Sequence, residues 1–392
     1  MTGFLQDQPV TIVGGGIGGL TAALCCARHG ARVLLHERAA EFTDIGAGVQ
    51  ITPNGAVVLA ALGLSAALDR VAIRAKAVCP VDAMSGRTLA RFDLTRLQGQ
   101  PYRFIHRADL IEILARACGK AGVDLRLGSA FAPGDAAVGV LVGADGLHSN
   151  LRPLLNGPEI PFFTGQVAWR AVVRAESPSE STPVARIWMA PGRHVVTYPL
   201  GGGVLNIVAV RAQSEWADEG WSHADDPAQL QSAFADTCPD LRALLARITE
   251  TRKWGLFRHP VAERWHGDGM ALLGDAAHPT LPFLAQGANL AIEDAWVLAS
   301  CLDRGLGLPA YQVLRRTRVE RAIAAANANA VNYHLRGVRR VAAHAGLQLI
   351  GTVAPGMFLR RLDWLYGRDV TRDWGMVLGP PDQASSSTQT GT

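Results

Sequence analysis

The segment Val10-Thr-Ile-Val-Gly14-Gly-Gly16-Ile-Gly-Gly19 decides how the N-terminal part of the chain folds. It begins with a short apolar run that predicts a buried strand, and the glycine cluster after it predicts a tight turn. Apolar residues then recur at helical spacing from Ile17 to His29, and Gly30 predicts the end of that helix. The run from Arg32 to His36 predicts a second buried strand. Strand, helix and strand within about 30 residues are typical of a parallel sheet with a right-handed crossover.

Three of these glycines satisfy the spacing GxGxxG, and each is required for a different structural reason. Gly14 permits the tight turn, Gly16 lets a pyrophosphate approach the backbone, and Gly19 lets the helix pack closely on the strand. The helix N-terminus offers free N–H groups to the phosphates. Glu37 closes the second strand, where its carboxylate would accept hydrogen bonds from a ribose diol and repel a 2′-phosphate. The pattern therefore predicts a site for FAD or NAD rather than NADP.

The composition of the 392 residues predicts a globular protein of two or three packed units. Hydrophobic residues make up 48% and charged residues 18%, which excludes a disordered chain. The formal net charge of +4 is small and scattered, so it does not predict a nucleic-acid partner. The six cysteines lie at neither CxxC nor zinc-ligand spacing, and no run reaches the ~20 apolar residues of a membrane span. We therefore expect a cytoplasmic protein with reduced thiols, no metal site and no stable membrane insertion.

The order of the segments predicts a discontinuous first domain. Met270 to Leu273 predicts a further buried strand, and Gly287 to Asp303 and Ala310 to Tyr333 predict helices that return to the first domain. Between the two parts lies a β-rich stretch with Pro and Gly turns, which predicts a separate antiparallel sheet. Its expected strands are Gln166–Val173, Ala185–Met189, His194–Leu200 and Val204–Val210. The expected division is a dinucleotide-binding domain (1–160 with 255–335), a substrate-binding sheet domain (161–254), a C-terminal helical segment (336–379) and a disordered polar tail (380–392).

Two later loops carry acidic residues at the ends of predicted strands. They are Gly143-Ala-Asp145-Gly146, leading to Arg152, and Gly274-Asp275-Ala-Ala-His-Pro279. With the opening glycine motif, these loops make nearly the whole chain similar to the group A flavoprotein monooxygenases, the aromatic hydroxylases with the p-hydroxybenzoate hydroxylase fold. The resemblance implies an α/β fold with a Rossmann-like FAD-binding domain, an inserted antiparallel sheet and C-terminal helices. It also implies FAD as the cofactor, NADH or NADPH as a co-substrate without a domain of its own, and O₂.

The resemblance implies roles for residues around the flavin. Asp275 would bind the ribityl or pyrophosphate region, Arg38 would lie near the adenosine half, Arg107 would contact FAD, and residues 287–289 would present backbone to the isoalloxazine ring. The full expected cofactor-binding set is Gly14, Gly16, Ile17, Gly18, Gly19, Glu37, Arg38, Gly48, Val49, Arg107, Asp145, Asp275, Pro279, Gly287, Ala288 and Asn289.

The segment His194-Val-Val-Thr-Tyr198-Pro lies on a predicted strand, so His194, Val196 and Tyr198 share one face. Four residues at ~3.3 Å separate the Cα atoms of His194 and Tyr198 by ~13 Å, which suits the two ends of a ring-sized substrate. The arrangement resembles the 3-hydroxybenzoate 6-hydroxylases and 6-hydroxynicotinate 3-monooxygenases, in which a His and a Tyr line the substrate site. Gln286 also matches the hydroxybenzoate pattern, whereas hydroxynicotinate enzymes carry His at the position of Gln50. We therefore expect His194, Tyr198 and Gln286 as catalytic residues and a hydroxybenzoate-like substrate.

The implied reaction places two demands on the site. Reduced flavin would take up O₂ as a C4a-hydroperoxide, so the pocket must exclude water. Transfer of a proton from a phenol of pKa ~10 to a histidine of pKa ~6.5 is uphill by about 5 kcal/mol, so the site must also favour the phenolate. Arg170 is either a clamp for a substrate carboxylate or part of the sheet surface, and His278 is expected to support its loop. The expected substrate-contacting walls are Gln50, Trp188, Val196, Leu281, Phe283 and Leu284.

Other functions remain open at this point. The ring could be an N-heteroaromatic or a quinone precursor, and the same scaffold could serve a flavin-dependent reductase or dehydrogenase without oxygen insertion. The apolar stretch from Ala342 to Tyr366 could mark a membrane-peripheral accessory protein of quinone biosynthesis. We favour packing of this stretch on the FAD-binding domain or a dimer contact, because Pro355-Gly356 interrupts any long amphipathic helix. The expected assembly is a monomer or a homodimer.

Overall fold

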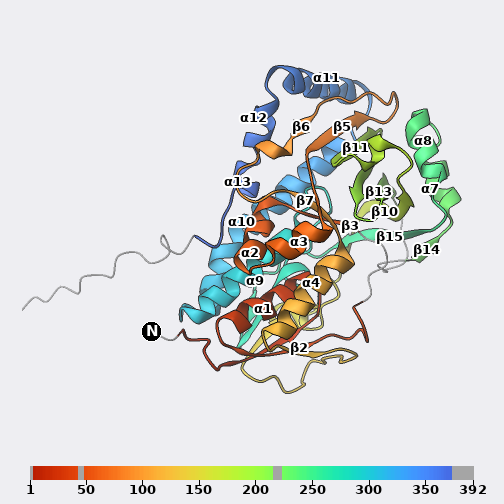
Figure 1. The fold of residues 1–392 in the computed structure, drawn as a ribbon. Helices are drawn as coiled ribbons and strands as arrows, with labels where there is room; N and C mark the ends of the chain where they lie inside the picture. Colours follow the sequence, from red (N-terminus) through yellow and green to blue (C-terminus); the bar gives the residue numbers. More distant parts are fainter. Residues whose placement is uncertain (1–2, 43–47, 215–222, 373–392) are drawn as a thin grey trace, which may run out of the picture.

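Two large sheets organise the chain in the computed structural model, which describes residues 3–42, 48–214 and 223–372 (Figure 1). The six-stranded sheet has the order β16-β17-β9-β1-β2-β8, and its strands are parallel except at the β16–β17 pair. The expected strand–helix–strand unit is confirmed, since β1 and β2 pair in parallel on either side of α1. The strands are β1 (Pro9–Val13), β2 (Arg32–His36), β8 (Asp124–Arg126), β9 (Val140–Gly143), β16 (His266–Gly267) and β17 (Met270–Leu272).

Helices pack around this sheet to form the main core. α1 lies against both α9 and α4, and α2 packs on α9. Proline at the first position of α2 supplies the fixed φ angle that starts a helix. The helices are α1 (Ile17–Arg28), α2 (Pro53–Ala61), α4 (Arg107–Lys120), α9 (Gly287–Asp303) and α10 (Gly307–Tyr333). Shorter helices are α3 (Ser65–Val71), α5 (Arg152–Asn156) and α6 (Pro178–Ser181), with 3₁₀ turns at Leu94–Arg96 and Gly274–Ala276.

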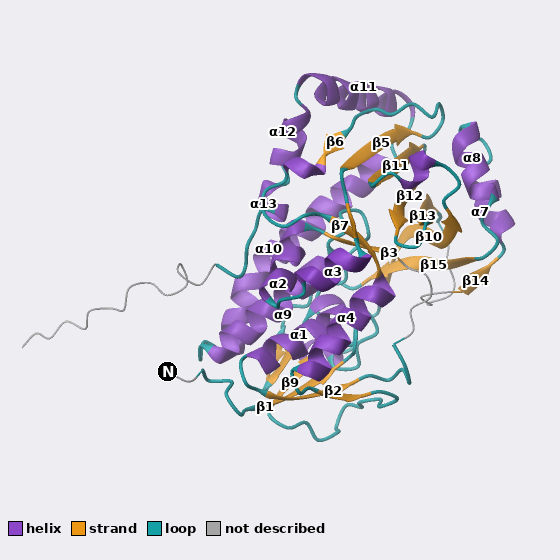
Figure 2. Ribbon diagram, in the orientation of Figure 1, coloured by secondary structure: helices purple, strands orange, loops and turns teal. Residues whose placement is uncertain are grey.

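The second large sheet has eight strands in the order β14-β15-β10-β13-β12-β11-β5-β6. All of its pairs are antiparallel except β11 with β5, and α7 (Pro227–Ala233) and α8 (Pro239–Ala246) lie beside it (Figure 2). All four strands predicted in the β-rich stretch are present. The strands are β5 (Ala77–Asp82), β6 (Phe92–Asp93), β10 (Phe162–Arg174), β11 (Val184–Ala190), β12 (Arg193–Leu200), β13 (Val204–Ala212), β14 (His223–Asp225) and β15 (Thr251–Arg258).

This sheet is not confined to the range 161–254 that the sequence suggested for it. β5 and β6 come from the segment before residue 160, and β15 continues to Arg258. The reason is the parallel pairing of β11 with β5, which joins strands about a hundred residues apart and leaves no trace in local hydrophobic patterns. The division into domains as a whole stays a prediction.

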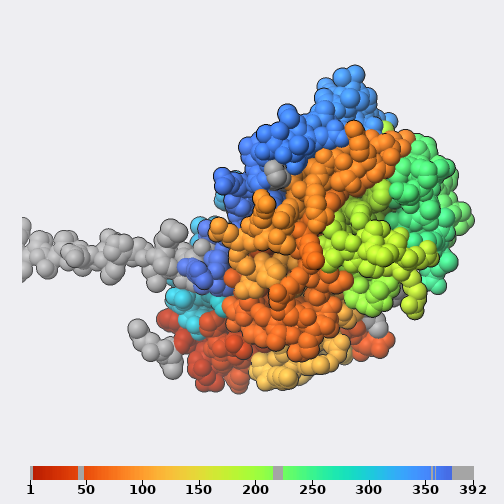
Figure 3. Space-filling view, turned by 45° about the horizontal axis from the view of Figure 1, so that its top comes forward, coloured from red at the N-terminus to blue at the C-terminus, as the bar shows by residue number. Residues whose placement is uncertain are grey.

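A small antiparallel sheet and the C-terminal helices complete the fold. β3 (Gly48–Ile51), β7 (Arg103–His106) and β4 (Ile73–Arg74) form the order β3-β7-β4. The C-terminal helices are α11 (Gly337–Val353), α12 (Pro355–Arg360) and α13 (Asp363–Tyr366). The apolar stretch is therefore interrupted directly before Pro355 and forms no single long helix, as expected. Figure 3 shows these helices in blue, alongside the orange segment that contains β5 and β6.

The apolar C-terminal stretch packs on the body of the molecule, as favoured from the sequence. Leu359, Leu365 and Tyr366 are buried in the main core that also holds β1 and α1. No helix in the described part of the chain has the length and apolar composition needed to cross a membrane. The predicted tail at 380–392 lies outside the described residues, as do the last residues of the predicted 336–379 segment.

Candidate active site

The three motif glycines adopt the geometry that their spacing predicts. Gly14 has a φ of +106°, and a Cβ there would lie 2.3 Å from the carbonyl oxygen of Ala144. A Cβ at Gly19 would lie 1.9 Å from the carbonyl oxygen of Gly14, so the helix and strand approach too closely for a side chain. At Gly16 a Cβ would meet nothing within 4 Å. Of these three glycines, only Gly16 therefore has free space beside its Cα atom, while the backbone around Gly14 and Gly19 is tightly packed.

A cavity of about 350 Å³ opens at Gly16 and extends to the eight-stranded sheet. The glycine loop, β3 and the start of α9 bound one side of it, and strands β10, β12, β13 and β15 bound the other. The structure thus brings together many predicted residues that are far apart in the sequence. Those lining the cavity are Gly16, Ile17, Gly18, Gly48, Val49, Gln50, Arg107, His194, Val196, Tyr198, Asp275, Leu281, Gln286, Gly287 and Ala288.

Two helix N-termini present backbone to this cavity. Gly16 caps α1 and Gln286 caps α9, and neither helix has a side-chain cap or an acidic residue in its first turn. Their terminal N–H groups are therefore available to the negative charge of a pyrophosphate or a flavin ring oxygen. The open space at Gly16 gives such a group room to approach. The residues present fit a flavin dinucleotide.

Asp275 lies at the cavity, in the 3₁₀ turn that precedes α9. Burial raises the pKa of its carboxyl group, although His278 and Arg107 act in the opposite direction. Arg107, at the start of α4, also lines the cavity. A carboxylate paired with a nearby cation can accept hydrogen bonds from ribityl hydroxyl groups. This geometry is compatible with the role predicted for Asp275.

Asp145 supports its loop rather than lining the cavity. Its Oδ2 accepts a hydrogen bond of 2.8 Å from the backbone N–H of Asn150, while its Oδ1 is buried without a partner among the described residues. Arg152 then connects this loop to the other acidic loop, because its Nη1 donates to the carbonyl oxygens of Ala276 and Ala277 at 3.1 Å each. The two acidic loops therefore hold each other in position.

Other predicted cofactor residues also lie outside the cavity lining. The carboxylate of Glu37 accepts hydrogen bonds from the backbone N–H groups of Gly15 at 2.6 Å and Ala39 at 2.8 Å, so it braces the glycine loop. Arg38 is exposed beside it. Asn289 is fully buried, and its side chain bridges the N–H of Thr52 and the carbonyl oxygen of Gln50. Pro279 is buried too and lies outside the cavity lining. Contact of these residues with the cofactor stays a prediction.

The sheet face at the cavity is built from alternate residues of neighbouring strands. His194, Val196 and Tyr198 of β12 share it, as their spacing predicts. In the strand register Val196 lies opposite Val208 of β13, and Val208 lies opposite Arg170 of β10. Arg170 lines the cavity, with its guanidinium carbon 5.2 Å from the centre of the Trp254 ring. Arg170 therefore belongs to the site and not to the outer surface of the sheet.

Tyr198 is buried where the sheet meets β3. Burial raises its pKa to about 12, although the positive charge of Arg170 acts in the opposite direction. A Cβ at Gly48 would lie 2.8 Å from the Tyr198 hydroxyl, so only glycine permits this approach. Nearby, the hydroxyl of Tyr102 donates a 2.6 Å hydrogen bond to Oε1 of Gln50. Tyr198 therefore reaches the cavity as a neutral phenol in a fixed position.

His194 is 2% exposed and lies among aromatic rings. Its ring centre is 5.5 Å from that of Phe283 and 5.1 Å from that of Tyr333. Its Nδ1 lies 2.8 Å from Nε2 of His334, so one of the two rings donates a hydrogen bond to the other. Burial and the neighbouring His334 hold the pKa of His194 well below its usual range. His194 is therefore a neutral imidazole at physiological pH.

Three expected substrate walls do not line the cavity. The prediction for Trp188 was wrong. In the β11–β12 register this residue lies opposite Val195, and it packs in the cluster on the other face of the sheet. Phe283 stands behind His194, and Leu284 is part of the main core. Sequence reasoning missed several residues that do form the wall: Val208, Val210, Leu256, Phe257 and Pro282. The only sequence signal for Val208 and Val210 was the alternation of side chains between the two faces of β13. That alternation does not show which strands lie beside β13 or in which register.

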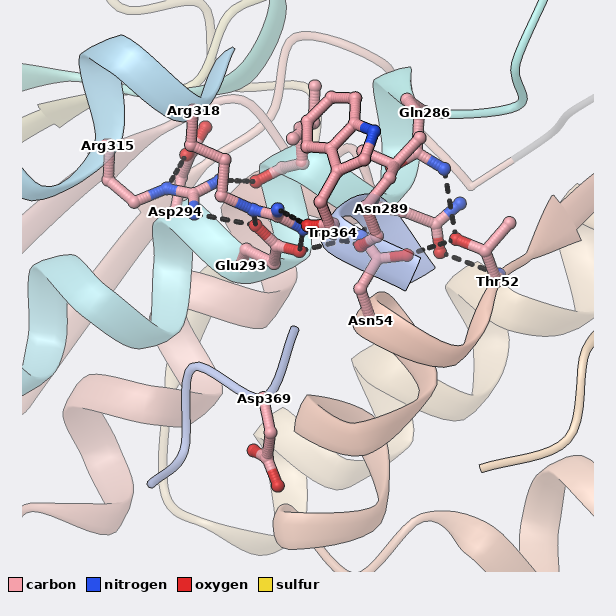
Figure 4. A network of polar contacts seen from close by, with 12 residues as sticks. Thr52, Asn54, Gln286, Asn289, Glu293, Asp294, Arg315, Arg318, Trp364 and Asp369 are labelled. Carbon is pink, nitrogen blue, oxygen red and sulfur yellow. Dashed lines mark hydrogen bonds and ion pairs between the residues drawn. The ribbon is translucent and has the colours of Figure 1, made fainter. Parts of the chain in front are cut away.

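Gln286 lines the cavity, but its amide is committed to buried neighbours (Figure 4). Its Nε2 donates to Oγ1 of Thr52, and its Oε1 accepts from Nδ2 of Asn54 at 3.1 Å. Asn54 also donates to Glu293 at 2.7 Å. Glu293 in turn pairs with Arg315 deep in the core. The start of α9 is therefore fixed through a chain of polar contacts that reaches α10.

His278 supports its loop, as expected from the sequence. It is 1% exposed, and its Nε2 lies 2.5 Å from Oδ2 of Asp294. The same oxygen accepts a hydrogen bond from the N–H of Gly274, the first residue of the 3₁₀ turn. His278 and Asp294 therefore hold the turn that carries Asp275.

Comparisons with known proteins agree with FAD as the cofactor. The model of a family described as FAD binding domain matches residues 7–133 and 139–328. A 3-amino-4-hydroxybenzoate 2-monooxygenase of Streptomyces platensis is 39% identical over 365 residues, which covers 86% of this chain and 91% of the relative. A 3-hydroxybenzoate 6-hydroxylase of Aquipseudomonas alcaligenes is 33% identical over 93% of this chain and 99% of the relative. A substrate complex of salicylate hydroxylase shares the fold, with a TM-score of 0.78 at 22% identity over 96% of this chain and 99% of that one.

We expect Gly16→Val to fold and to purify with less bound cofactor than the parent protein. The φ of −72° at Gly16 is open to valine, and the new side chain would occupy the empty space beside the N-terminus of α1. Overpacking of this kind costs about 1–3 kcal/mol, or roughly 5- to 150-fold in affinity. The flavin absorbance of the purified protein and its circular dichroism measure the two effects separately. Gly119→Val on α4, another glycine with open space at Cβ, should retain FAD. An FAD-replete Gly16→Val protein would contradict this view of the loop.

Proposed function

The chain belongs to the family of FAD-dependent aromatic-ring monooxygenases, and from this premise we propose that its substrate is a hydroxybenzoate-like ring, hydroxylated at the expense of NAD(P)H and O₂. The observation that carries the proposal is the cavity face of the large sheet. One cationic side chain, Arg170, and one neutral imidazole, His194, flank an apolar centre on that face. A ring that carries a carboxylate at one end and a hydroxyl at the other matches this order of groups.

The strand register supports a ring of this size. Arg170 and His194 are two strands and two residues apart, which puts their Cα atoms ~12 Å from each other. The Arg170 guanidinium is held against the Trp254 ring, so it is preorganised to receive a carboxylate in a bidentate pair. Val196, Val208 and Leu281 form apolar walls that exclude water from the centre.

Bound FAD, once reduced by NAD(P)H, would supply activated oxygen at the flavin side of the cavity. The protein must then make the substrate ring electron-rich, and ionisation of its hydroxyl does so. A neutral His194 accepts a hydrogen bond, and finally the proton, from this hydroxyl. Because the pKa of His194 is lowered, the transfer is more uphill than the ~5 kcal/mol of an ordinary histidine and phenol. The positive charge of Arg170 favours the anionic substrate and offsets part of this cost.

The test is a flavin-reduction screen followed by isotope labelling. NADH is added to the yellow protein with a panel of hydroxybenzoates, the corresponding phenols without a carboxylate, and hydroxynicotinates. We expect hydroxybenzoates to accelerate loss of the flavin colour and to yield a product that carries ¹⁸O from ¹⁸O₂. A product without ¹⁸O would instead support a reductase or dehydrogenase. Acceleration by hydroxynicotinates alone would support the N-heteroaromatic alternative.

Arg170→Met should weaken binding of carboxylated substrates. Loss of a hydrogen-bonded charge costs about 1.5–3 kcal/mol, so KM should rise by roughly 10- to 10²-fold while KM for the uncarboxylated phenol changes little. Steady-state kinetics with both substrates measure the difference. Arg252→Met is the matched control, because Arg252 lies opposite Arg170 on β15 but is exposed outside the cavity lining. An equal rise in KM for the two substrates would remove the carboxylate clamp from the proposal.

We also propose that the enzyme acts in the cytoplasm as a monomer or a homodimer. All six cysteines are buried free thiols, which suits a reducing compartment. Cell fractionation and light scattering of the purified protein test the two statements.

A further inference from the structure

The imidazole of His194 joins two cavities that are separate in the structure. On one side the ring of His194 lines the inner cavity. On the other side its Nδ1 contacts Nε2 of His334 at 2.8 Å. His334 lines a different, outer pocket of about 520 Å³, at the surface beside Val331, which is 65% exposed. The two rings therefore form a continuous polar path through an otherwise apolar and aromatic wall.

The position of His334 is fixed by the fold. His334 is the residue that ends α10, and its carbonyl oxygen accepts a hydrogen bond from the N–H of Gly192 at 3.1 Å. Gly192 lies in the turn between β11 and β12, two residues before His194. The turn and the helix end thus hold the two imidazoles at hydrogen-bond distance. His334 is half-buried, so its outer edge reaches water.

We propose that His334 is a proton-relay residue that carries the proton of the substrate hydroxyl from His194 to water in the outer pocket. This inference rests on the proposed function, because it concerns ionisation of a hydroxylated ring in the inner cavity. His334 does not touch the substrate and acts through His194.

The transfer moves protons only, and no group is oxidised or reduced. The O–H bond of the substrate breaks and an N–H bond forms at Nε2 of His194. At the same time the proton on Nδ1 of His194 moves to Nε2 of His334, and the proton on Nδ1 of His334 passes to water. Each imidazole stays neutral overall and changes its tautomer. The return of one proton when the product regains its hydroxyl restores both tautomers.

The surroundings explain why a relay is needed. His194 lies among Phe283 and Tyr333 and is almost fully buried, so a positive charge held there would be poorly solvated. Burial and Arg336 lower the pKa of His334 to about 4, so a charge does not rest on His334 either. Arg336 and Arg339 both line the outer pocket. Their positive charges favour release of the proton to solvent.

The test compares two variants of His334 in the full-length, FAD-loaded protein. In His334→Gln the amide oxygen can still accept a hydrogen bond from Nδ1 of His194, but it cannot pass a proton on. In His334→Ala the outer pocket becomes continuous with Nδ1 of His194, which gives a small base from solution room to act. 3-Hydroxybenzoate is the probe, and a pH indicator in weak buffer reports proton release when it binds to the oxidised protein.

We expect both variants to bind the probe, as seen in the flavin absorbance, and to release the proton about 10²-fold more slowly than the parent protein. Added imidazole should restore the rate in His334→Ala and not in His334→Gln. Val331→Ala, in the same outer pocket, should release the proton at the parental rate. A parental rate in His334→Gln, or no response of His334→Ala to imidazole, would overturn the relay. If the parent protein neither binds nor hydroxylates any hydroxybenzoate, the proposed substrate class fails instead, which is a separate result.

Discussion

Replacement of His194 by Gln should lower the rate of ring hydroxylation by about 10²-fold or more while FAD stays bound. Glutamine fills much of the imidazole's volume and can donate a hydrogen bond, but it cannot accept the proton of the substrate hydroxyl. His194 packs against the Phe283 and Tyr333 rings, and neither can replace it as a base: phenylalanine has no ionisable group, and burial raises the pKa of Tyr333. Chromatography of the hydroxylated product formed per unit time measures the effect.

The pH dependence of this variant separates proton removal from packing. Without His194 the substrate must ionise by itself, so the variant's activity should rise with pH towards the phenol pKa of ~10. The parental enzyme, whose His194 has a lowered pKa and is neutral throughout the neutral range, should depend much less on pH there. His29→Gln, a histidine at the end of α1 that pairs with Asp303, should behave like the parent. Equal activity of His194→Gln at neutral pH would exclude His194 from proton removal.

The parts of the site that could be predicted from the sequence are those set by local geometry. The glycine spacing predicts a turn with left-handed backbone at Gly14 and close packing at Gly19, and both are present. A period of two predicts that His194, Val196 and Tyr198 share a face, and they do. Such patterns depend on a few consecutive residues, so they hold whatever the rest of the chain does.

The parts that could not be predicted depend on strand register and on contacts between distant segments. Trp188 was assigned to the wrong face because its orientation follows from pairing with Val195, and periodicity says nothing about which strand lies beside which. The contact of His194 with His334 joins residues 140 positions apart in the sequence. Arg170 was left undecided for the same reason, since only the assembled sheet shows that its face borders the cavity.

A buried ion network links the flavin side of the cavity to the C-terminal helices. Glu293 and Asp294 of α9 are 0% exposed and Arg315 of α10 is 1% exposed, with N–O distances of 2.6 and 2.7 Å between Arg315 and the two carboxylates. Arg318 also pairs with Glu293 at 2.7 Å and donates to the carbonyl oxygen of Trp364 at 2.8 Å (Figure 4). The two acidic and two basic side chains balance each other in charge. Removal of one member therefore leaves an uncompensated charge in the core.

Glu293→Ala should accordingly destabilise the protein by about 3–5 kcal/mol. Arg315 and Arg318 would lose a shared partner, and Asn54, which also holds Gln286, would lose its hydrogen bond to Glu293. Urea unfolding followed by tryptophan fluorescence measures the loss of stability, and the FAD content of the purified variant shows whether the start of α9 shifts with it. Glu320→Ala on α10 breaks an exposed pair with Arg316 and should cost only about 0.3–0.5 kcal/mol.

The sign of the pH dependence follows from the same network. Burial acts to raise the pKa of Glu293, but Arg315 and Arg318 outweigh it and hold the pKa below the usual value of 4.5. A carboxyl group whose pKa is lower in the folded state stabilises the fold above its usual pKa and loses that effect as the pH falls through the lowered value. The parental protein should therefore lose stability in acid faster than Glu293→Ala, and the two unfolding free energies should converge below pH 4.5. Parallel pH profiles would show that the Glu293 carboxylate does not contribute through its charge.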